Sequence, residues 1–292
     1  MTSVIIVNYN TLALLRKCIL SVFSHSKQKI EVIVVDNASS EPGLDELEKE
    51  FPQVILIRNS QNLGFAKANN IGIAHASGEY VLLLNSDAEL LNDVIEICGS
   101  ILDNNTHVGV VSARLQYSNG QVQHCCQAFP AIGNELVELL RLHKLMDPHK
   151  RAMRFFGAFF DHRESCLTDW VWGTSFMFRK KDLQKLKEGL LNEDYFMYGE
   201  DMEWCHQFYE VGLHSYYEAK ACVLHHAGGS QFGNESKKNK TIIRHELAFV
   251  KKHHGLLYLL VYRLVKSLKL YSLSIRDSKY KDLAKAYLSS LT

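Results

Sequence analysis

The sequence predicts an α/β fold in which a mostly parallel sheet is flanked by helices and followed by a C-terminal helical extension. Short apolar runs rich in β-branched residues, typical of strands, alternate with longer segments that have apolar residues at helical spacing. The strand runs are apolar almost throughout, which indicates a parallel sheet covered on both faces. From residue 237 onward the chain is expected to be wholly helical and basic.

The expected elements follow one another in a regular order through the first half of the chain. Strands are expected at residues 3–8, 31–35, 54–58, 80–85 and 108–112, with helices at 12–24, 44–51, 65–76 and 92–103. Beyond them, residues 114–168 are irregular apart from a helix near 134–145, and a strand at 170–179, a helix at 200–211 and a short strand at 221–224 follow. This change of pattern divides the chain into residues 1–113, residues 114–235 and a tail of residues 236–292.

Charge is distributed unevenly along the chain. The net charge is +1, yet residues 236–292 alone carry 13 Lys and Arg against three Asp and Glu. The body of the protein is therefore acidic, which suits a cation-dependent site, and the tail is basic, which suits an anionic surface. No nucleic-acid-binding motif accompanies the basic tail, so we expect no nucleic acid partner.

Cysteine usage and the N-terminus indicate a cytoplasmic protein. The seven cysteines are an odd number and form no CxxC pair, which argues against a zinc ribbon and a disulfide framework and favours reduced, buried thiols. Residues 1–9 have the pattern of a first strand rather than of a signal peptide, and no window reaches the ~18 apolar residues of a membrane span.

Polar residues follow three of the expected strands. Asn8-Tyr9, Asp36-Asn37 and Asn85-Ser86-Asp87 stand where these strands end. In parallel α/β sheets, ligands bind beyond the carboxyl ends of the strands. A carboxylate there can bind a base or ribose, or hold a divalent cation against a diphosphate, although a strand-end Asp also serves as a turn or helix cap.

Three further segments have residue types that suit chemistry. Gly64 opens a helix, where the backbone can approach an anion closely. Glu200-Asp201 places two carboxylates at the start of another helix. There they suit either general-base catalysis or a favourable interaction with the helix dipole. His225-His226 ends a strand and suits a metal site or a buried hydrogen bond.

The order of these motifs is more specific than any one of them. The segments SVIIVNYN, VDNAS, NLGFAKANNIG, LLLNSDA, WGTSFMFR, YFMYGEDMEWC and HHAGGS closely resemble, in this order, the family-2 glycosyltransferases with a GT-A fold. Within that family the chain is most similar to the rhamnosyltransferase-type enzymes of bacterial surface-polysaccharide assembly. The resemblance covers about residues 3–230.

The resemblance implies roles for the matching positions. Residues 1–113 would form the nucleotide-sugar-binding half and residues 114–235 the acceptor-binding and catalytic half of one GT-A domain. Asp201 resembles the catalytic base, with Glu200 beside it. The positions that resemble the nucleotide-sugar site are Asn8, Tyr9, Asp36, Asn37, Gly64, Lys67, Asn69, Asn85, Trp172 and Gly173. Those that resemble the metal and diphosphate site are Asp87 and His225 or His226, of which the spacing to Ser230 favours His225.

The implied reaction is a single displacement with inversion, assisted by Mg²⁺ or Mn²⁺. The donor would be dTDP-rhamnose or a UDP-hexose, and the acceptor a glycan, free or linked to a polyprenyl diphosphate. Asn85 stands where the family's DxD motif has its first carboxylate. This substitution keeps open the alternative of a catalytically silent module that binds a glycan or a protein partner.

Residues 256–271 have the pattern of an amphipathic helix. Arg263, Lys266 and Lys269 share one side, and the other side carries Leu257, Leu260, Val261, Leu264 and Leu268. Such a helix suits the surface of an anionic membrane, which would make the protein peripheral on the inner face of the plasma membrane. The apolar side equally suits packing on the catalytic domain or on a second subunit, so oligomerisation also stays open.

Overall fold

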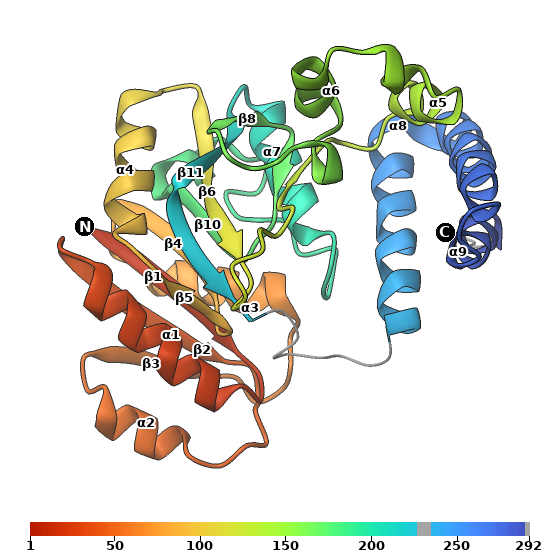
Figure 1. Ribbon diagram of the computed structural model, residues 1–292. Coiled ribbons are helices and arrows are strands. Elements are labelled where there is room, and N and C mark those ends of the chain that lie inside the picture. Colours follow the sequence, from red (N-terminus) through yellow and green to blue (C-terminus); the bar gives the residue numbers. More distant parts are fainter. Residues whose placement is uncertain (227–234, 290–292) are drawn as a thin grey trace. The chain divides into compact units, whose positions relative to one another are not determined.

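A computed structural model describes residues 1–226 and 235–289 (Figure 1). The chain forms two compact units. The first combines Met1–Gln127 with Phe160–Gln231, and the second combines Ala128–Phe159 with Phe232–Thr292. The chain passes from one unit to the other three times, whereas the sequence pattern indicated three consecutive parts with boundaries after residues 113 and 235.

The first unit is built on a nine-stranded sheet with the strand order β3-β2-β1-β4-β10-β6-β11-β5, in which β8 also pairs with β11. Its strands are β1 (Thr2–Asn8), β2 (Ile30–Asp36), β3 (Val54–Arg58), β4 (Tyr80–Asn85), β5 (Ala88–Leu90), β6 (Val108–Gln116), β8 (Cys166–Thr168), β10 (Ser175–Arg179) and β11 (His214–His225). The strands β3, β2, β1 and β4 are mutually parallel. This confirms the expected sheet of the first half.

Helices flank this sheet, as Figure 1 shows. They are α1 (Leu12–His25), α2 (Leu44–Glu50), α3 (Phe65–His75), α4 (Val94–Asn104) and α7 (Glu200–Glu210), with a 3₁₀ helix, η3, at Lys180–Lys185. The central strands β1, β2 and β4 bury nearly every residue, because helices cover the sheet on either side. The predicted fold class, a helix-flanked and mostly parallel sheet, is confirmed.

The second half of the first unit departs from the expected elements. The strand expected at residues 170–179 is two strands, because Gly173 and Thr174 interrupt it: β9 (Trp170–Val171) pairs with β7 (Cys126–Gln127) in a separate small sheet, and β10 joins the main sheet. The short strand expected at 221–224 is the end of β11, whose earlier residues (HSYYEAK) contain no apolar run.

The second unit is helical among the residues that the structure describes. Its elements are α5 (Ile132–Leu139), η1 (Leu142–Leu145), α6 (Pro148–Phe155), η2 (Gly157–Phe159), α8 (Glu235–Ser274) and α9 (Lys279–Ser289). The helix expected near 134–145 therefore ends early, and α6 and η2 were not expected in the irregular segment. Gly255, at φ 84°, kinks α8. A core that includes Leu247, Leu259, Tyr262 and Tyr287 holds the unit together. None of the helices in the described ranges is both long and apolar enough to cross a bilayer.

Arg179 is a buried cation that ties three elements of the first unit together. Its guanidinium donates to the carbonyl of Val108 at 2.9 Å and to those of Leu102 and Asn105 at 2.5 and 2.9 Å, at the end of α4. It also pairs with the buried Asp182 at 2.7 Å. A cation among the last carbonyls of a helix is favourable for the helix dipole.

Arg179→Met is expected to lower the free energy of unfolding by about 3 kcal/mol, because the carbonyls of Leu102, Asn105 and Val108 lose their buried donor and the buried Asp182 is left with Lys185, at 2.7 Å, as its charge partner. Urea denaturation measures this. Arg58→Met is the matched control, since Arg58 pairs with Asp45 and Glu48 on the surface, and should cost about 1 kcal/mol or less. Equal losses in the two variants would contradict the structural role of the buried pair.

Candidate active site

The register of the parallel strands brings the predicted strand-end residues to one edge of the sheet. Asn8 of β1 is opposite Asp36 of β2, and Val7 is opposite Asn85 of β4. Asn8 is fully buried, and its side-chain amide donates to Asp36 Oδ1 at 2.8 Å. The structure thus brings Asn8 and Asp36 into direct contact, with Asn8 supporting the Asp36 carboxylate from inside the sheet.

The Asp36 carboxylate is held in one orientation. Ser39 donates to it twice, from Oγ to Oδ1 at 2.6 Å and from its backbone N–H to Oδ2 at 3.0 Å. These bonds and the one from Asn8 fix the carboxylate at the strand end. Tyr9, which follows Asn8, is half-buried at the same edge.

Asn37 holds the loop that leads to Gly64. Its amide donates to Asn62 Oδ1 at 2.8 Å and to Gly64 O at 3.2 Å, and its Oδ1 accepts from Leu63 N at 3.0 Å. Gly64 has φ 84°, and a Cβ there would come within 2.5 Å of the carbonyl oxygen of Phe196. Only glycine fits this position, which joins the loop to the segment preceding Glu200.

The two polar residues predicted on the next helix differ in their surroundings. Lys67, in the first turn of α3, is exposed and available to an anionic ligand. Asn69 is buried, and its side-chain amide donates to the carbonyl of Phe65 in the same helix at 2.9 Å.

Asp201 lies in the first turn of α7 and faces the WGT segment. Its Oδ2 accepts from the backbone N–H of Gly173 at 3.3 Å, and its Oδ1 accepts from that of Met202 at 2.9 Å. A Cβ on Gly173 would lie 3.5 Å from the Cβ of Asp201, an ordinary van der Waals contact, so this approach does not itself require glycine. Trp172, the preceding residue, is half-buried.

Glu200 and Asp201 have different electrostatic surroundings. Burial raises the pKa of Asp201 to about 6, although backbone N–H donors including those of Met202 and Gly173 oppose the rise. Burial raises the pKa of Glu200 well above its usual range, and the neighbouring Asp201 raises it further. Glu200 therefore stays protonated where Asp201 is ionised, which leaves one carboxylate of the pair as a base near neutral pH.

Asp87 faces His225 where β11 pairs with β5, and His225 is opposite Ala88 in the register. The distance from His225 Nε2 to Asp87 Oδ1 is 3.3 Å. Gln123 is a residue that the sequence did not indicate. Its side-chain Nε2 donates to His225 O at 2.8 Å, and its Oε1, which can only accept, therefore accepts from His225 Nδ1 at 2.7 Å. The neutral ring then has its lone pair on Nε2, directed toward the carboxylate of Asp87.

This arrangement fits a divalent cation. Two acceptors that face each other need a proton or a cation between them, and two adjacent ligands of an octahedral Mg²⁺ lie about 3 Å apart. Asn85, two residues before Asp87, has an Oδ1 that is buried without a hydrogen-bond partner among the described residues, an acceptor that a cation would satisfy. Oxygen donors and one imidazole suit Mg²⁺ or Mn²⁺.

The two candidate histidines have different partners. The ring of His226 meets Glu89, with Nε2 2.6 Å from Oε1, whereas that of His225 faces Asp87. Glu89, which lies in β5 two residues beyond Asp87, is a further residue that the sequence did not indicate. The remainder of the HHAGGS motif, Ala227–Ser230, falls outside the described residues.

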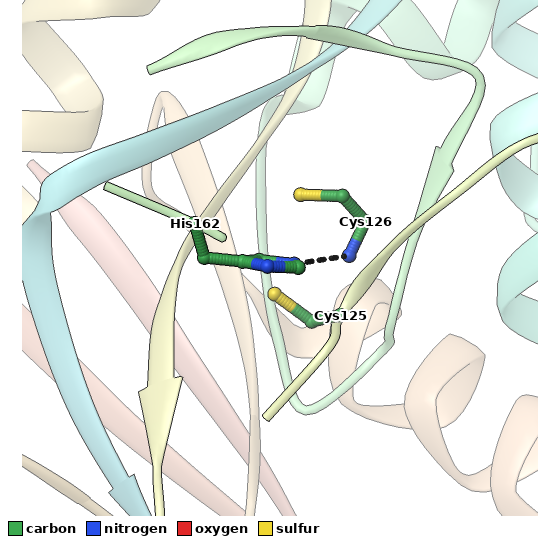
Figure 2. Close-up of side chains that lie close together, drawn as sticks. All are labelled: Cys125, Cys126 and His162. Carbon is green, nitrogen blue, oxygen red and sulfur yellow. Dashed lines mark hydrogen bonds between the residues drawn. The ribbon is translucent and has the colours of Figure 1, made fainter. Parts of the chain in front are cut away.

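Figure 2 shows a second group of metal-binding residue types, Cys125, Cys126 and His162, with the imidazole ring between the two thiols. All three are buried. His162 Nε2 accepts from the backbone N–H of Cys126 at 3.3 Å, and Nδ1 bonds the carbonyl of Phe160 at 2.8 Å. Both ring nitrogens are thus bonded to backbone groups, and thiols are poor ligands for Mg²⁺ or Mn²⁺. We assign this cluster to the core. All seven cysteines are free thiols, five of them buried.

Comparison with known proteins gives a family and a fold. The sequence model described as Glycosyl transferase family 2 matches residues 3–187. The uncharacterized protein y4gI of Sinorhizobium fredii is 23% identical over 86% of this chain and 27% of its own length. Glycosyltransferase GlyA of Streptococcus pneumoniae is 34% identical over 32% of this chain and 14% of its own. The chain thus spans only about a quarter or less of these relatives.

Solved structures resemble the whole chain. A mannosyltransferase from Pyrobaculum calidifontis, in complex with GDP-Man and Mn²⁺, has a TM-score of 0.61 at 15% identity and covers 98% of this chain and 84% of its own. GalNAc-T7 with UDP, GalNAc and Mn²⁺ has a TM-score of 0.63 at 15% identity, covering 99% of this chain and 54% of its own. These similarities confirm the expected GT-A fold.

Gln123→Leu is expected to weaken Mn²⁺ binding about 10- to 100-fold, because the residue that orients a metal ligand sets the direction of its lone pair. The EPR signal of free Mn²⁺, followed during titration of the protein with a nucleoside diphosphate present, measures the affinity. Gln127→Leu is the matched control, since its amide donates to His124 O rather than to the candidate metal ligands. Unchanged affinity in Gln123→Leu would contradict the orienting role.

Proposed function

The chain belongs to glycosyl transferase family 2, and we propose that it is an inverting glycosyltransferase that moves a sugar from a nucleoside diphosphate sugar to a glycan hydroxyl. One connection carries the proposal. Thr174 O accepts from the backbone N–H of Asn85 at 3.1 Å, and the preceding residue, Gly173, donates to Asp201. Two consecutive residues thus link the strand-end residues at this edge of the sheet to the half-buried carboxylate of Asp201.

In the proposed mechanism Asp201 is the general base. It accepts the proton of the acceptor hydroxyl, whose oxygen attacks the anomeric carbon from the face opposite the nucleotide, so that the configuration inverts. The bonds from Gly173 and Met202 hold the carboxylate in place. Protonated Glu200 adds no second charge beside the base.

The edge of the sheet would hold the donor. Asp36 would bind the base or ribose, and Tyr9, Lys67 and the loop fixed by Asn37 would line the nucleotide. Asp87, His225 and Asn85 would hold Mg²⁺ or Mn²⁺, which when bound neutralises charge on the leaving nucleoside diphosphate. The N-terminal end of α3, which follows Gly64, would favour a diphosphate through the helix dipole.

The donor and acceptor follow from motif similarity. We place the chain in the rhamnosyltransferase-like branch, with dTDP-rhamnose or a UDP-hexose as donor and a glycan, free or linked to a polyprenyl diphosphate, as acceptor in surface-polysaccharide synthesis at the cytoplasmic side of the membrane. The solved neighbours contain GDP-Man or UDP, and another, TarS of S. aureus, contains UDP-GlcNAc.

A catalytically silent glycan- or partner-binding module on the same fold is the second candidate. The observation that favours it is Asn85, whose neutral amide replaces the first carboxylate of the family's metal motif. An amide oxygen ligates a hard cation more weakly than a carboxylate does. Ligand binding and turnover together distinguish the two candidates.

Asp201→Asn is expected to lower the rate of transfer about 10²- to 10⁴-fold, because it removes the general base. Nucleotide binding should persist, because Asp36 and Asp87 are unchanged. Thermal shifts with UDP, dTDP, GDP and CDP, with and without Mn²⁺, identify the nucleotide, since a ligand of the folded state raises the melting temperature. Transfer is then measured as nucleoside diphosphate released in the presence of candidate acceptors.

Two outcomes would contradict this assignment. Normal turnover in Asp201→Asn would show that another group is the base. A nucleotide-induced shift without turnover in the wild type, across the glycan and lipid-linked acceptors tested, would favour the silent module.

The rate is also expected to depend on the ionisation of Asp201. The base is active when deprotonated, and burial raises its pKa to about 6. The pH profile of kcat/KM should therefore rise through pH 6 and fall about tenfold per pH unit below it. Glu200→Gln should keep an acid limb, because Glu200 is already neutral there. A flat profile between pH 5 and 7.5 would contradict Asp201 as the base.

A further inference from the structure

The part of α8 that follows Gly255 exposes its apolar side. Six large apolar residues, termed here the α8 stripe, are each at least 41% exposed: Leu256, Leu257, Leu260, Val261, Leu264 and Leu268. Leu257 is 78% exposed and Leu264 54%. Their spacing places them along one face of the helix for about three turns. Contiguous apolar surface of this kind marks an interaction site.

The opposite face of the helix carries its charges, and these are buried inside the second unit. Lys266 lies 2.7 Å from Glu135 and 3.3 Å from Glu246. Lys269 pairs with Glu135 and, at 3.3 Å, with Glu138. Both lysine side chains are less than a fifth exposed.

This ion-pair network fixes the rotation of the helix. Turning α8 over to bury the leucines would expose or separate these buried pairs, which is strongly unfavourable. Tyr262 adds to the constraint, because it is fully buried and its hydroxyl donates to Glu246 at 2.5 Å. The outward direction of the α8 stripe is therefore a property of the folded unit.

Charge identifies the partner. The second unit, residues 128–159 and 232–292, has 18 Lys and Arg against seven Asp and Glu. The exposed basic residues of the unit include Lys251 and Lys252 before the kink and Arg276, Lys281 and Lys285 after the end of α8. A second copy would bring the same charge to the interface and be repelled, whereas an anionic lipid surface attracts it.

We propose that the second unit docks on an anionic lipid surface, with the α8 stripe inserted between the headgroups and exposed basic residues of the same unit on lipid phosphates. Helices of this type lie in the plane of the interface, and their affinity grows with the buried apolar area and with the anionic lipid content. The inference rests on the second unit alone and is independent of the proposed transferase activity.

The test is flotation of the whole chain with two kinds of vesicle, phosphatidylcholine alone and phosphatidylcholine mixed with phosphatidylglycerol. The wild type should float with the anionic vesicles and be released by high salt. The double variant Leu260→Gln/Leu264→Gln should lose about tenfold or more of its partitioning, because two side chains no longer bury apolar area in the interface.

Matched variants separate the contributions. Leu20→Gln/Ile55→Gln changes two residues that are 51% and 43% exposed in the first unit and should bind like the wild type. Lys281→Glu/Lys285→Glu should weaken binding to the anionic vesicles. Circular dichroism checks that each variant is folded, as expected for changes at exposed side chains.

Three results would overturn the proposal. The first is a folded wild type that does not bind anionic vesicles, and the second is equal binding by the stripe variant. The third is a dimer, found by light scattering, that Leu260→Gln/Leu264→Gln converts to a monomer while vesicle binding is absent. That result would assign the stripe to a second copy of the chain.

Discussion

The parallel register of β1 with β2 and β4 is the constraint on which the rest of the site depends. It sets Asn8 opposite Asp36 and Val7 opposite Asn85, so that three strands end at one level. A slip of one residue would turn each buried side chain to the other face, and the apolar strands would then lose their packing. The same burial that stabilises the sheet therefore aligns the polar residues that follow it.

Two antiparallel additions to this sheet complete the site. β10 runs against β4 and brings Gly173 and Thr174 beside Asn85, while β11 runs against β5 and brings His225 beside Asp87. β10 begins and β11 ends near the carboxyl ends of the parallel strands. The candidate base and the candidate metal ligands thus come from distant parts of the sequence. His225 is positioned by strand pairing, whereas Asp201 lies on α7 and its carboxylate is held by the backbone N–H groups of Gly173 and Met202.

Burial of charged side chains has a different effect in each of the two units. In the first unit it raises the pKa of both Glu200 and Asp201, and the N–H donors on Asp201 let that residue ionise first. In the second unit the buried charges are paired: Lys266 and Lys269 are buried against acidic partners, while leucines of the same helix are exposed. A buried ion pair here sets an orientation, a role distinct from a net gain in stability.

The sequence by itself determined the parallel half of the fold and most of the strand-end residues. Apolar runs and helical spacing report burial directly, so the strands near Asn8, Asp36 and Asn85 were predicted to within a residue or two. Tertiary structure alone decided the partners. Gln123 orients His225 from 102 residues away, the two halves of the expected strand at 170–179 join different sheets, and the apolar side of α8 faces outward. Local periodicity shows that a helix has two faces, but which face is buried depends on charges such as Glu135 that pack against it from another element.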